Sequence, residues 1–283
     1  MYGTKVNYEA NGVTDWKVFY KQTVGTEEYV YLIASEALAY DKVPTVLKTS
    51  YGATIAEGTV QISDTESRQV GQIYWLSAPA GRAVASTAKD KWLAKWSNYA
   101  SGANAKCVSY FLDEGIWSSF ANTTEYVDAN GESYVKGAIG TPTAEMFIAS
   151  WNEIREATGN TTKYNKKLEL VPNETIGYYV NDITNGEATS NRGSQSLSTS
   201  DPLYTWSTSS NSTVWLASPS SSTSYLLIAD RGGGVYGSVY GNSSGKTFYG
   251  VRPVVCLSSK IPSQVGGNNS IIIKKNSSSN ETQ

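Results

Sequence analysis

The stretch YGVRPVVCL, residues 249–257, contains the β-branched run that decides how we interpret the whole chain. It predicts a strand over 250–257, because valines favour pleated, buried positions. Arg252 stands beside Pro253 at the start of that strand. We interpret this arginine as a structural residue, which forms an ion pair or clamps backbone carbonyls, and not as a ligand contact. The positions that we expect in the hydrophobic core are Trp215, Val251, Val254 and Val255.

The residues upstream of this strand predict a β-hairpin. Strands over 225–230 and 235–240 flank a turn at 231–234, RGGG, whose glycines allow positive φ without steric cost. Further strands are predicted at 214–217, before the hairpin, and at 271–274, near the end of the chain.

Two aromatic and β-branched runs, over 15–20 and 29–34, predict another hairpin near the N-terminus. Its connection contains Gly25, and we expect a longer loop there. The next residues, SEAL at 35–38, are typical of a helix start. The stretch 36–80 gives mixed signals.

Helical patterns occur in the middle of the chain. Apolar residues recur at helical spacing over 87–99, with lysines opposite, and a short helix is predicted over 104–113. At 144–157 an apolar run leads to SWNE, residues 150–153, which matches a capping box and predicts a strand followed by a short helix. Residues 185–213 are rich in Ser, Thr and Asn and predict a long surface loop.

Two glycine patterns resemble nucleotide-binding motifs but lack the necessary context. Gly232, Gly234 and Gly237 match G-x-G-x-x-G, yet a strand pattern follows where a helix N-terminus should bind the pyrophosphate. The stretch 241–247 has one residue fewer between its glycines than a phosphate-binding loop requires. We interpret both patterns as turn and surface glycines.

The composition excludes several classes of chemistry. The 283-residue chain has no histidine, which excludes Ser-His-Asp and Cys-His catalysis and histidine-ligated zinc. Its two cysteines are too few for a four-cysteine metal site, and we expect no metal and no cofactor. The net charge of −2 provides no basic field to attract nucleic acid or an anionic membrane.

The cysteines and the apolar runs bear on the compartment. Cys107 and Cys256 form a disulfide if the protein is exported, and are two buried thiols otherwise. No run of 18 apolar residues appears, so we expect no direct membrane insertion. We expect any export signal or anchor to lie outside this sequence.

Several segments together resemble the C-type-lectin-fold domains of bacterial and phage surface proteins. The segments are NGVTDWKVFY and YVYLIASE near the N-terminus, AEMFIASWNEI, WLASPS and above all YGVRPVVCL. This family includes pilin-like surface proteins and the variable proteins of diversity-generating retroelements. The resemblance covers roughly residues 5–275. It implies one α+β domain over 1–275, with mixed antiparallel sheets, two main helices and long loops, before a disordered tail at 276–283.

The resemblance also implies a ligand-facing surface in the segment 215–256. In retroelement-driven members, mutagenesis at adenines diversifies this segment into Asn, Ser, Tyr, Gly, Asp and Thr codons, and the hairpin is rich in several of these residues. Tyrosine with serine, glycine and asparagine also dominates antibody paratopes. An ordinary solvated hairpin without a ligand explains the same composition. The candidate contact residues are Tyr225, Arg231, Tyr236, Ser238, Tyr240, Asn242, Lys246 and Phe248.

Rival chemistries have weaker support. Ser86 and Lys89 match the S-x-x-K pair of penicillin-recognising enzymes, but S-D-N and K-T-G have no counterpart. The calcium-dependent sugar motifs of animal C-type lectins are absent, and the cysteines are too few for formylglycine-generating chemistry. Composition alone does not exclude a carboxylate-pair glycosidase.

We therefore expect a non-catalytic adhesion or receptor-recognition module on a bacterial or phage surface, with a protein or glycan partner on another cell. The alternative is a structural pilin-like subunit without a dedicated ligand site.

Overall fold

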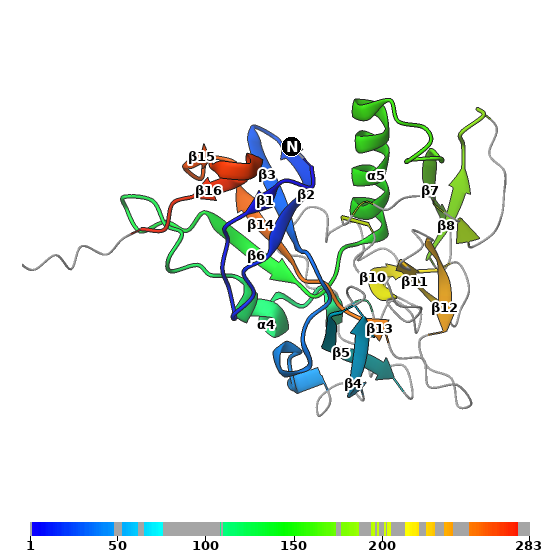
Figure 1. The fold of residues 1–283 in the computed structure, drawn as a ribbon, viewed down its shortest axis with the longest axis horizontal. Helices are drawn as coiled ribbons and strands as arrows, with labels where there is room; N and C mark the ends of the chain where they lie inside the picture. Colours follow the sequence, from blue (N-terminus) through cyan, green and yellow to red (C-terminus); the bar gives the residue numbers. More distant parts are fainter. Residues whose placement is uncertain are drawn as a thin grey trace, which may run out of the picture.

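The fold is α+β and consists mostly of strands (Figure 1). The computed structural model describes residues 2–47, 53–61, 65–75, 108, 110–173, 177–186, 194–195, 197, 201, 203–204, 213–220, 225–229, 235–239 and 249–276. Within them, the α-helices with defined bounds are α4 (Glu114–Trp117) and α5 (Ala144–Thr158). Short 3-10 helices are η1 (Tyr40–Lys42), η3 (Ser118–Phe120) and η4 (Gly267–Asn269).

The first large sheet brings together strands from near the two ends of the chain. Its strand order is β15-β16-β1-β2-β3-β14-β6. Near the N-terminus, Val6 of β1 pairs in parallel with Ile271 of β16, which is the strand predicted at 271–274. The bounds are β1 (Lys5–Val6), β2 (Trp16–Val24), β3 (Glu27–Ala34), β6 (Val135–Ile139), β14 (Val254–Ser258), β15 (Ser263–Val265) and β16 (Ile271–Ile273).

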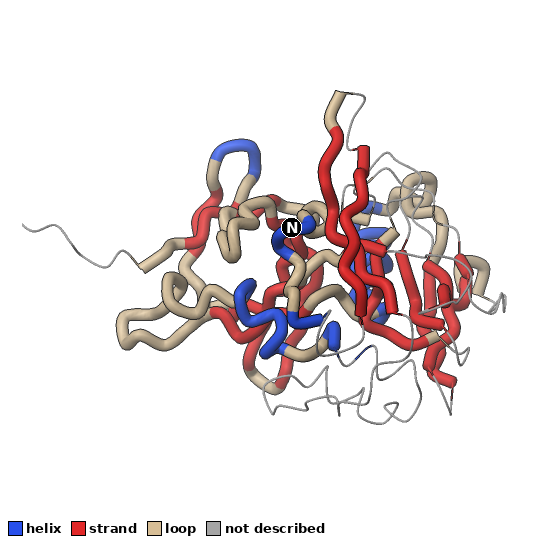
Figure 2. The backbone as a smooth tube through the Cα atoms, turned by 90° about the horizontal axis from the view of Figure 1, so that it is seen from below, coloured by secondary structure: helices blue, strands red, loops and turns tan. Residues whose placement is uncertain are grey.

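The second large sheet contains the hairpin predicted upstream of residue 249. Its order is β4-β5-β13-β10-β11-β12-β9, and the remaining strands, β7 and β8, pair with each other. Figure 2 shows the sheets as separate groups of strands. The bounds are β4 (Ala53–Gln61), β5 (Ser67–Trp75), β7 (Leu168–Asn173), β8 (Gly177–Asp182), β9 (Ser194–Gln195), β10 (Val214–Pro219), β11 (Tyr225–Ala229), β12 (Val235–Val239) and β13 (Tyr249–Gly250).

The stretch 249–257 is not one strand, and this corrects the prediction. Gly250 of β13 pairs with β10 and β5 in the second sheet, whereas Val254 begins β14 in the first sheet. The residues between them cross from one sheet to the other. Their backbone is tied to the end of β3 and to the loop after it: Ala34 N donates to Pro253 O at 3.0 Å, and Leu38 N donates to Val251 O at 2.9 Å.

Arg252 stabilises this crossing as a carbonyl clamp, which confirms one of its two predicted roles. Its side chain is fully buried, and its guanidinium donates to three backbone carbonyls. Nε bonds Ala34 O at 2.8 Å, Nη1 bonds Leu203 O at 3.0 Å and Nη2 bonds Ser35 O at 3.2 Å. Burial lowers the pKa of Arg252 to about 10, so the group is charged at neutral pH.

The N-terminal hairpin forms as predicted but with a shorter loop. Strand β2 continues to Val24, which pairs with Glu27, so only two residues connect the strands. Gly25 has φ +64° at the first loop position, a conformation that tight two-residue hairpin turns require. The residues after 20 are mostly polar because this end of β2 is partly exposed, and in sequence they therefore resemble a loop.

Residues 35–38 do not start a helix. Ser35 N donates to Asp15 O and Leu38 N donates to Val251 O, so the backbone makes hydrogen bonds to distant segments of the chain in place of helical ones. Helix-forming side chains are overridden here by long-range pairing.

Helix α5 replaces the strand and short helix predicted at 144–157. It begins at Ala144, and Thr143 is its N-cap, because the Thr143 hydroxyl accepts from Met146 N at 3.1 Å. Ser150, predicted as the cap, lies inside the helix. Its hydroxyl donates to Phe19 O at 2.5 Å and contacts the Tyr204 hydroxyl at 2.7 Å.

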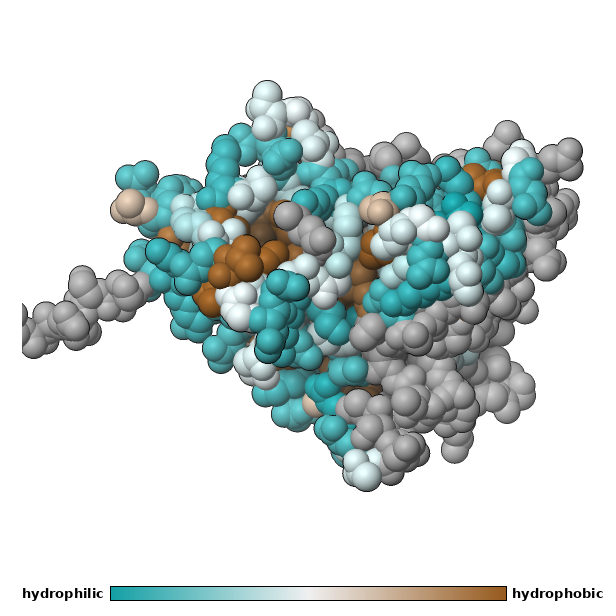
Figure 3. Space-filling model, turned by 45° about the horizontal axis from the view of Figure 1, so that its top comes forward, coloured by the Kyte–Doolittle hydropathy of each residue, from teal (hydrophilic) through white to brown (hydrophobic). Residues whose placement is uncertain are grey.

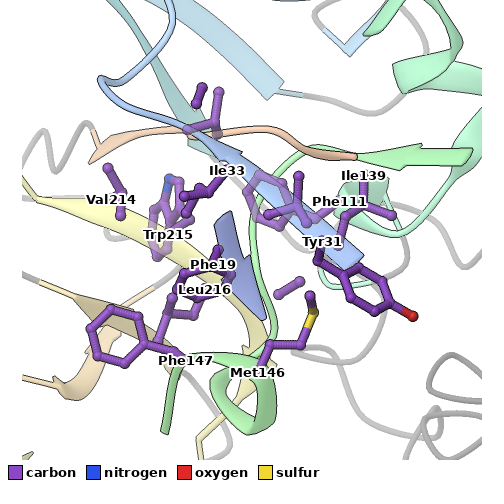
Figure 4. Packing of buried hydrophobic residues seen from close by; sticks show 14 of the residues in the cluster. Phe19, Tyr31, Ile33, Phe111, Ile139, Met146, Phe147, Val214, Trp215 and Leu216 are labelled. Carbon is purple, nitrogen blue, oxygen red and sulfur yellow. The ribbon is translucent and has the colours of Figure 1, made fainter. Parts of the chain in front are cut away.

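The core lies between the two large sheets and α5. Figure 4 shows Trp215 and Leu216 of β10 beside Phe19 of β2 and Phe147 of α5. The rings of Phe19 and Phe147 have centroids 6.4 Å apart. The four positions expected in the core are buried, with exposed fractions of 1% or less.

Several predictions lie partly or wholly outside the described residues. The helix at 87–99 lies wholly outside, and the described part of 104–113 includes helical residues at 108, 110 and 111.

Within 185–213 the prediction of a surface loop is wrong for the described residues Gln195, Leu197, Leu203 and Tyr204, which are all buried. They pack inward because β9 pairs with β12 and Tyr204 packs on α5. Of the tail, only Asn276 is described.

The Arg252 clamp can be tested by Arg252→Met. We expect the free energy of unfolding to fall by about 3 kcal/mol or more, because three buried carbonyls lose their donors. Urea denaturation at neutral pH measures the change. Arg252→Lys should not rescue it, since one ammonium cannot span three carbonyls. A loss below about 1 kcal/mol for Met would contradict the assigned role.

The N-cap can be tested by Thr143→Ala, with Thr143→Ser as the matched control. Alanine should cost about 1 kcal/mol of unfolding free energy, because Met146 N loses its acceptor, whereas serine keeps the hydroxyl. Thermal denaturation followed by circular dichroism measures both variants. Equal destabilisation by alanine and serine would argue that packing, and not capping, matters at this position.

Candidate functional site

The candidate contact residues lie in and around the β11–β12 hairpin. The structure describes the backbone of Tyr225, Tyr236 and Ser238, within the two strands. Their side chains lie outside the described part of the structure. The remaining candidates also lie outside it: Arg231, Tyr240, Asn242, Lys246 and Phe248.

The backbone pairing between β11 and β12 fixes which residues of the two strands lie opposite each other. Tyr236 pairs with Ile228 and Ser238 pairs with Leu226. Both partners on β11 have fully buried side chains, so β11 is an interior strand of the domain. On its other side, β12 pairs with β9 through Val235. The hairpin is therefore held on both edges and is not a free ribbon.

Trp215 anchors β10, the strand that precedes the hairpin. Its side chain is fully buried, and its indole N–H donates to Ile73 O of β5 at 3.0 Å. Its ring packs edge-on against Tyr249 of β13, with centroids 4.6 Å apart. The Thr141 hydroxyl also donates to Trp215 O. Strand β10 is thus tied to its neighbours by polar and aromatic contacts.

The start of α5 is joined to the same strand. Ala144 N, at the first helical position, donates to the Ser218 hydroxyl at 2.7 Å, and Ala217 N donates to Pro142 O at 2.9 Å. Sequence reasoning missed this contact, because Ala144 and Ser218 are 74 positions apart and carry no joint signal. The contact makes β10, and the hairpin beside it, a continuation of the rigid core.

Glu36 gives this region a titratable group near neutral pH. Burial raises its pKa from 4.5 to about 7, although Arg252, Arg68 and Lys17 oppose that shift. Burial also lowers the pKa of Lys17, with a further contribution from Arg252. The neighbourhood of the sheet crossing thus contains charges that are partly removed from water.

The described residues provide little for metal or redox chemistry. Within them, no group of three or more His, Cys, Asp or Glu side chains could hold a metal ion. Cys256 is buried in β14, whereas Cys107 lies outside the described ranges, so their pairing stays a prediction. Among the helices of the described part, none is long and apolar enough to cross a membrane.

Comparison with family models, with curated proteins and with solved structures finds no match to this chain.

The ionisation of Glu36 predicts a pH-dependent stability. The folded state binds this proton more tightly than the unfolded state, so the stabilisation is present below pH 4.5 and is lost as the pH rises through about 7. Glu36→Gln, which stays neutral, should therefore raise the melting temperature at pH 8 and change it little at pH 4.

Differential scanning calorimetry at both pH values measures the effect, with Glu132→Gln, at an exposed position, as the control. A lower melting temperature for Glu36→Gln at pH 8 would mean that the ionised carboxylate stabilises its cationic neighbours.

Proposed function

We propose that this chain is a non-catalytic recognition module of the C-type lectin fold, displayed on a bacterial or phage surface. It contacts a protein or glycan on another cell through the β11–β12 hairpin and the residues that follow it. The observation that carries the proposal is the support of this hairpin: β10 and β9 hold its two edges, and Trp215 and Arg252 bracket it in the core. A rigid scaffold of this kind suits a surface of adaptable loop residues.

The assignment to the C-type lectin fold rests on the sequence resemblance, and one feature of the fold supports it. The ends of the chain meet in one sheet, through β1 and β16. The resemblance also extends to a variable segment over 215–256. A reverse transcriptase gene beside a near-copy of these codons, differing at adenines, would identify a diversity-generating retroelement.

The second candidate function is a structural pilin-like subunit. One observation favours it: β15 forms an edge of the first sheet, and its three residues are exposed, with Val265 81% exposed. An exposed edge strand can pair with a strand of another chain. In such a subunit, the hairpin decorates a fibre and has no ligand.

The double variant Tyr236→Ala, Tyr240→Ala distinguishes these functions. In the recognition module it should abolish binding to a panel of bacterial and eukaryotic cells and to a glycan array, because rigid aromatics carry most of the binding energy. The melting temperature should stay nearly unchanged. Flow cytometry with labelled protein measures cell binding.

Tyr40→Ala is the matched control, since Tyr40 is 43% exposed in η1, outside the hairpin. Binding that survives the double variant would move the site elsewhere, and a large loss of stability would show that the tyrosines belong to the core.

A further inference from the structure

Strands β1 and β16, which lie near the two ends of the chain, run side by side in the same direction. Because the strands are parallel, the chain enters β1 at one end of the pair and leaves β16 at the other end. In Figure 1 the N-terminal end lies on the side of α5, whereas the segment after β16, in red, leaves on the opposite side. Tension applied to the chain through these two ends therefore pulls β1 and β16 past each other, in shear.

The side chain of Asn7 lengthens this strand pair. Asn7 N donates to Ile271 O at 3.2 Å, which is a backbone bond of the parallel pair. The side-chain amide then takes the place of a further peptide group, because Ile273 N donates to Asn7 Oδ1 at 2.7 Å and Asn7 Nδ2 donates to Ile273 O at 3.3 Å. These hydrogen bonds join one residue near the N-terminus to two residues of β16, and shear loads all of them at once.

Packing opposes the same movement. Val6 and Ile273 both belong to the hydrophobic core, with exposed fractions of 2% and 3%. Since side chains alternate along a strand, a slip of β16 by one residue would turn Ile273 away from the core. On its other side β1 is paired with β2, where Val6 lies opposite the buried Trp16. Withdrawal of β1 from the sheet therefore breaks its pairing with both neighbours.

The chain is bonded again where it leaves β16. Asn276 N donates to Glu125 O at 2.7 Å, and Lys275 Nζ lies 2.9 Å from Glu125 Oε2 and 3.2 Å from Glu9 Oε2. Figure 3 shows a largely hydrophilic surface, and the Lys275 side chain is 40% exposed. Ion pairs that are open to water contribute little to stability. The resistance to shear is therefore assigned to Asn7 and the strand pair, and not to Lys275.

We infer that the β1–β16 pair, completed by Asn7, is a shear clamp that keeps the domain folded when the chain is under tension. Bonds loaded in shear must break together, whereas bonds loaded from one end break one after another and yield at a lower force. The domain can thereby transmit force between whatever is attached at its two ends. This property does not depend on the function proposed for the β11–β12 hairpin, which belongs to the second sheet.

The first test pulls the same chain in two directions with optical tweezers. Handles at the two termini load the pair in shear. A handle on an azide-bearing residue in place of Thr14, used with the C-terminal handle, instead peels β16 from β1. Thr14 is exposed and lies between β1 and β2, at the end of the pair where β16 leaves. At one constant force, unfolding should be about tenfold slower or more in shear than in peeling.

Equal unfolding rates in the two directions would overturn the inference. This comparison leaves every residue of the clamp unaltered, so it decides the matter even where a variant of Asn7 does not fold.

The second test removes the side-chain bonds. Asn7→Ala should speed unfolding under shear about tenfold, because two hydrogen bonds that carry load are lost. Asn152→Ala is the matched control, since the Asn152 amide makes the same two bonds to one residue outside the clamp. Its Nδ2 donates to Leu168 O at 2.6 Å, and its Oδ1 accepts from Leu168 N at 3.0 Å, between α5 and β7.

Asn152→Ala should lower the melting temperature but leave the unfolding rate under shear nearly unchanged. Circular dichroism establishes that both variants are folded before they are pulled. Equal acceleration by the two variants would show a loss of general stability in place of a clamp, and an unchanged rate for Asn7→Ala would contradict the role of its side chain.

Discussion

The buried guanidinium of Arg252 holds together the point where the chain passes from the second large sheet to the first. A charge in the interior is costly unless it is hydrogen-bonded, and here three backbone carbonyls meet its fork of donors. These carbonyls belong to the end of β3, the residue after it, and Leu203. The clamp therefore joins three segments that are far apart in sequence, and the placement of both sheets depends on it.

The second sheet is connected directly to that crossing. Strand β13 enters it immediately before Arg252, and β10 lies alongside, with the indole of Trp215 bonded to β5. The start of α5 is bonded to Ser218 at the other end of β10. The β11–β12 hairpin is joined to this strand, and the described side chains of β11 are themselves buried in the core, a rigid support of the kind that the proposed recognition module would need. The same rigidity would suit a structural subunit.

Local patterns in the sequence were sufficient for the two strands on either side of 231–234, the strand near residue 271 and the buried valines after residue 250. Each follows from turn chemistry or from the run of β-branched residues. The sequence left the role of Arg252 open between an ion pair and a carbonyl clamp, because its partners Ala34, Ser35 and Leu203 are distant in sequence. Tertiary structure alone decided the split of 249–257 between two sheets, the cap of α5 at Thr143 and the burial of Tyr204. These depend on contacts between segments distant in sequence, whose free energy exceeds the local preference of the residues for one secondary structure. At residues 35–38, for example, hydrogen bonds to distant segments replace the predicted helix.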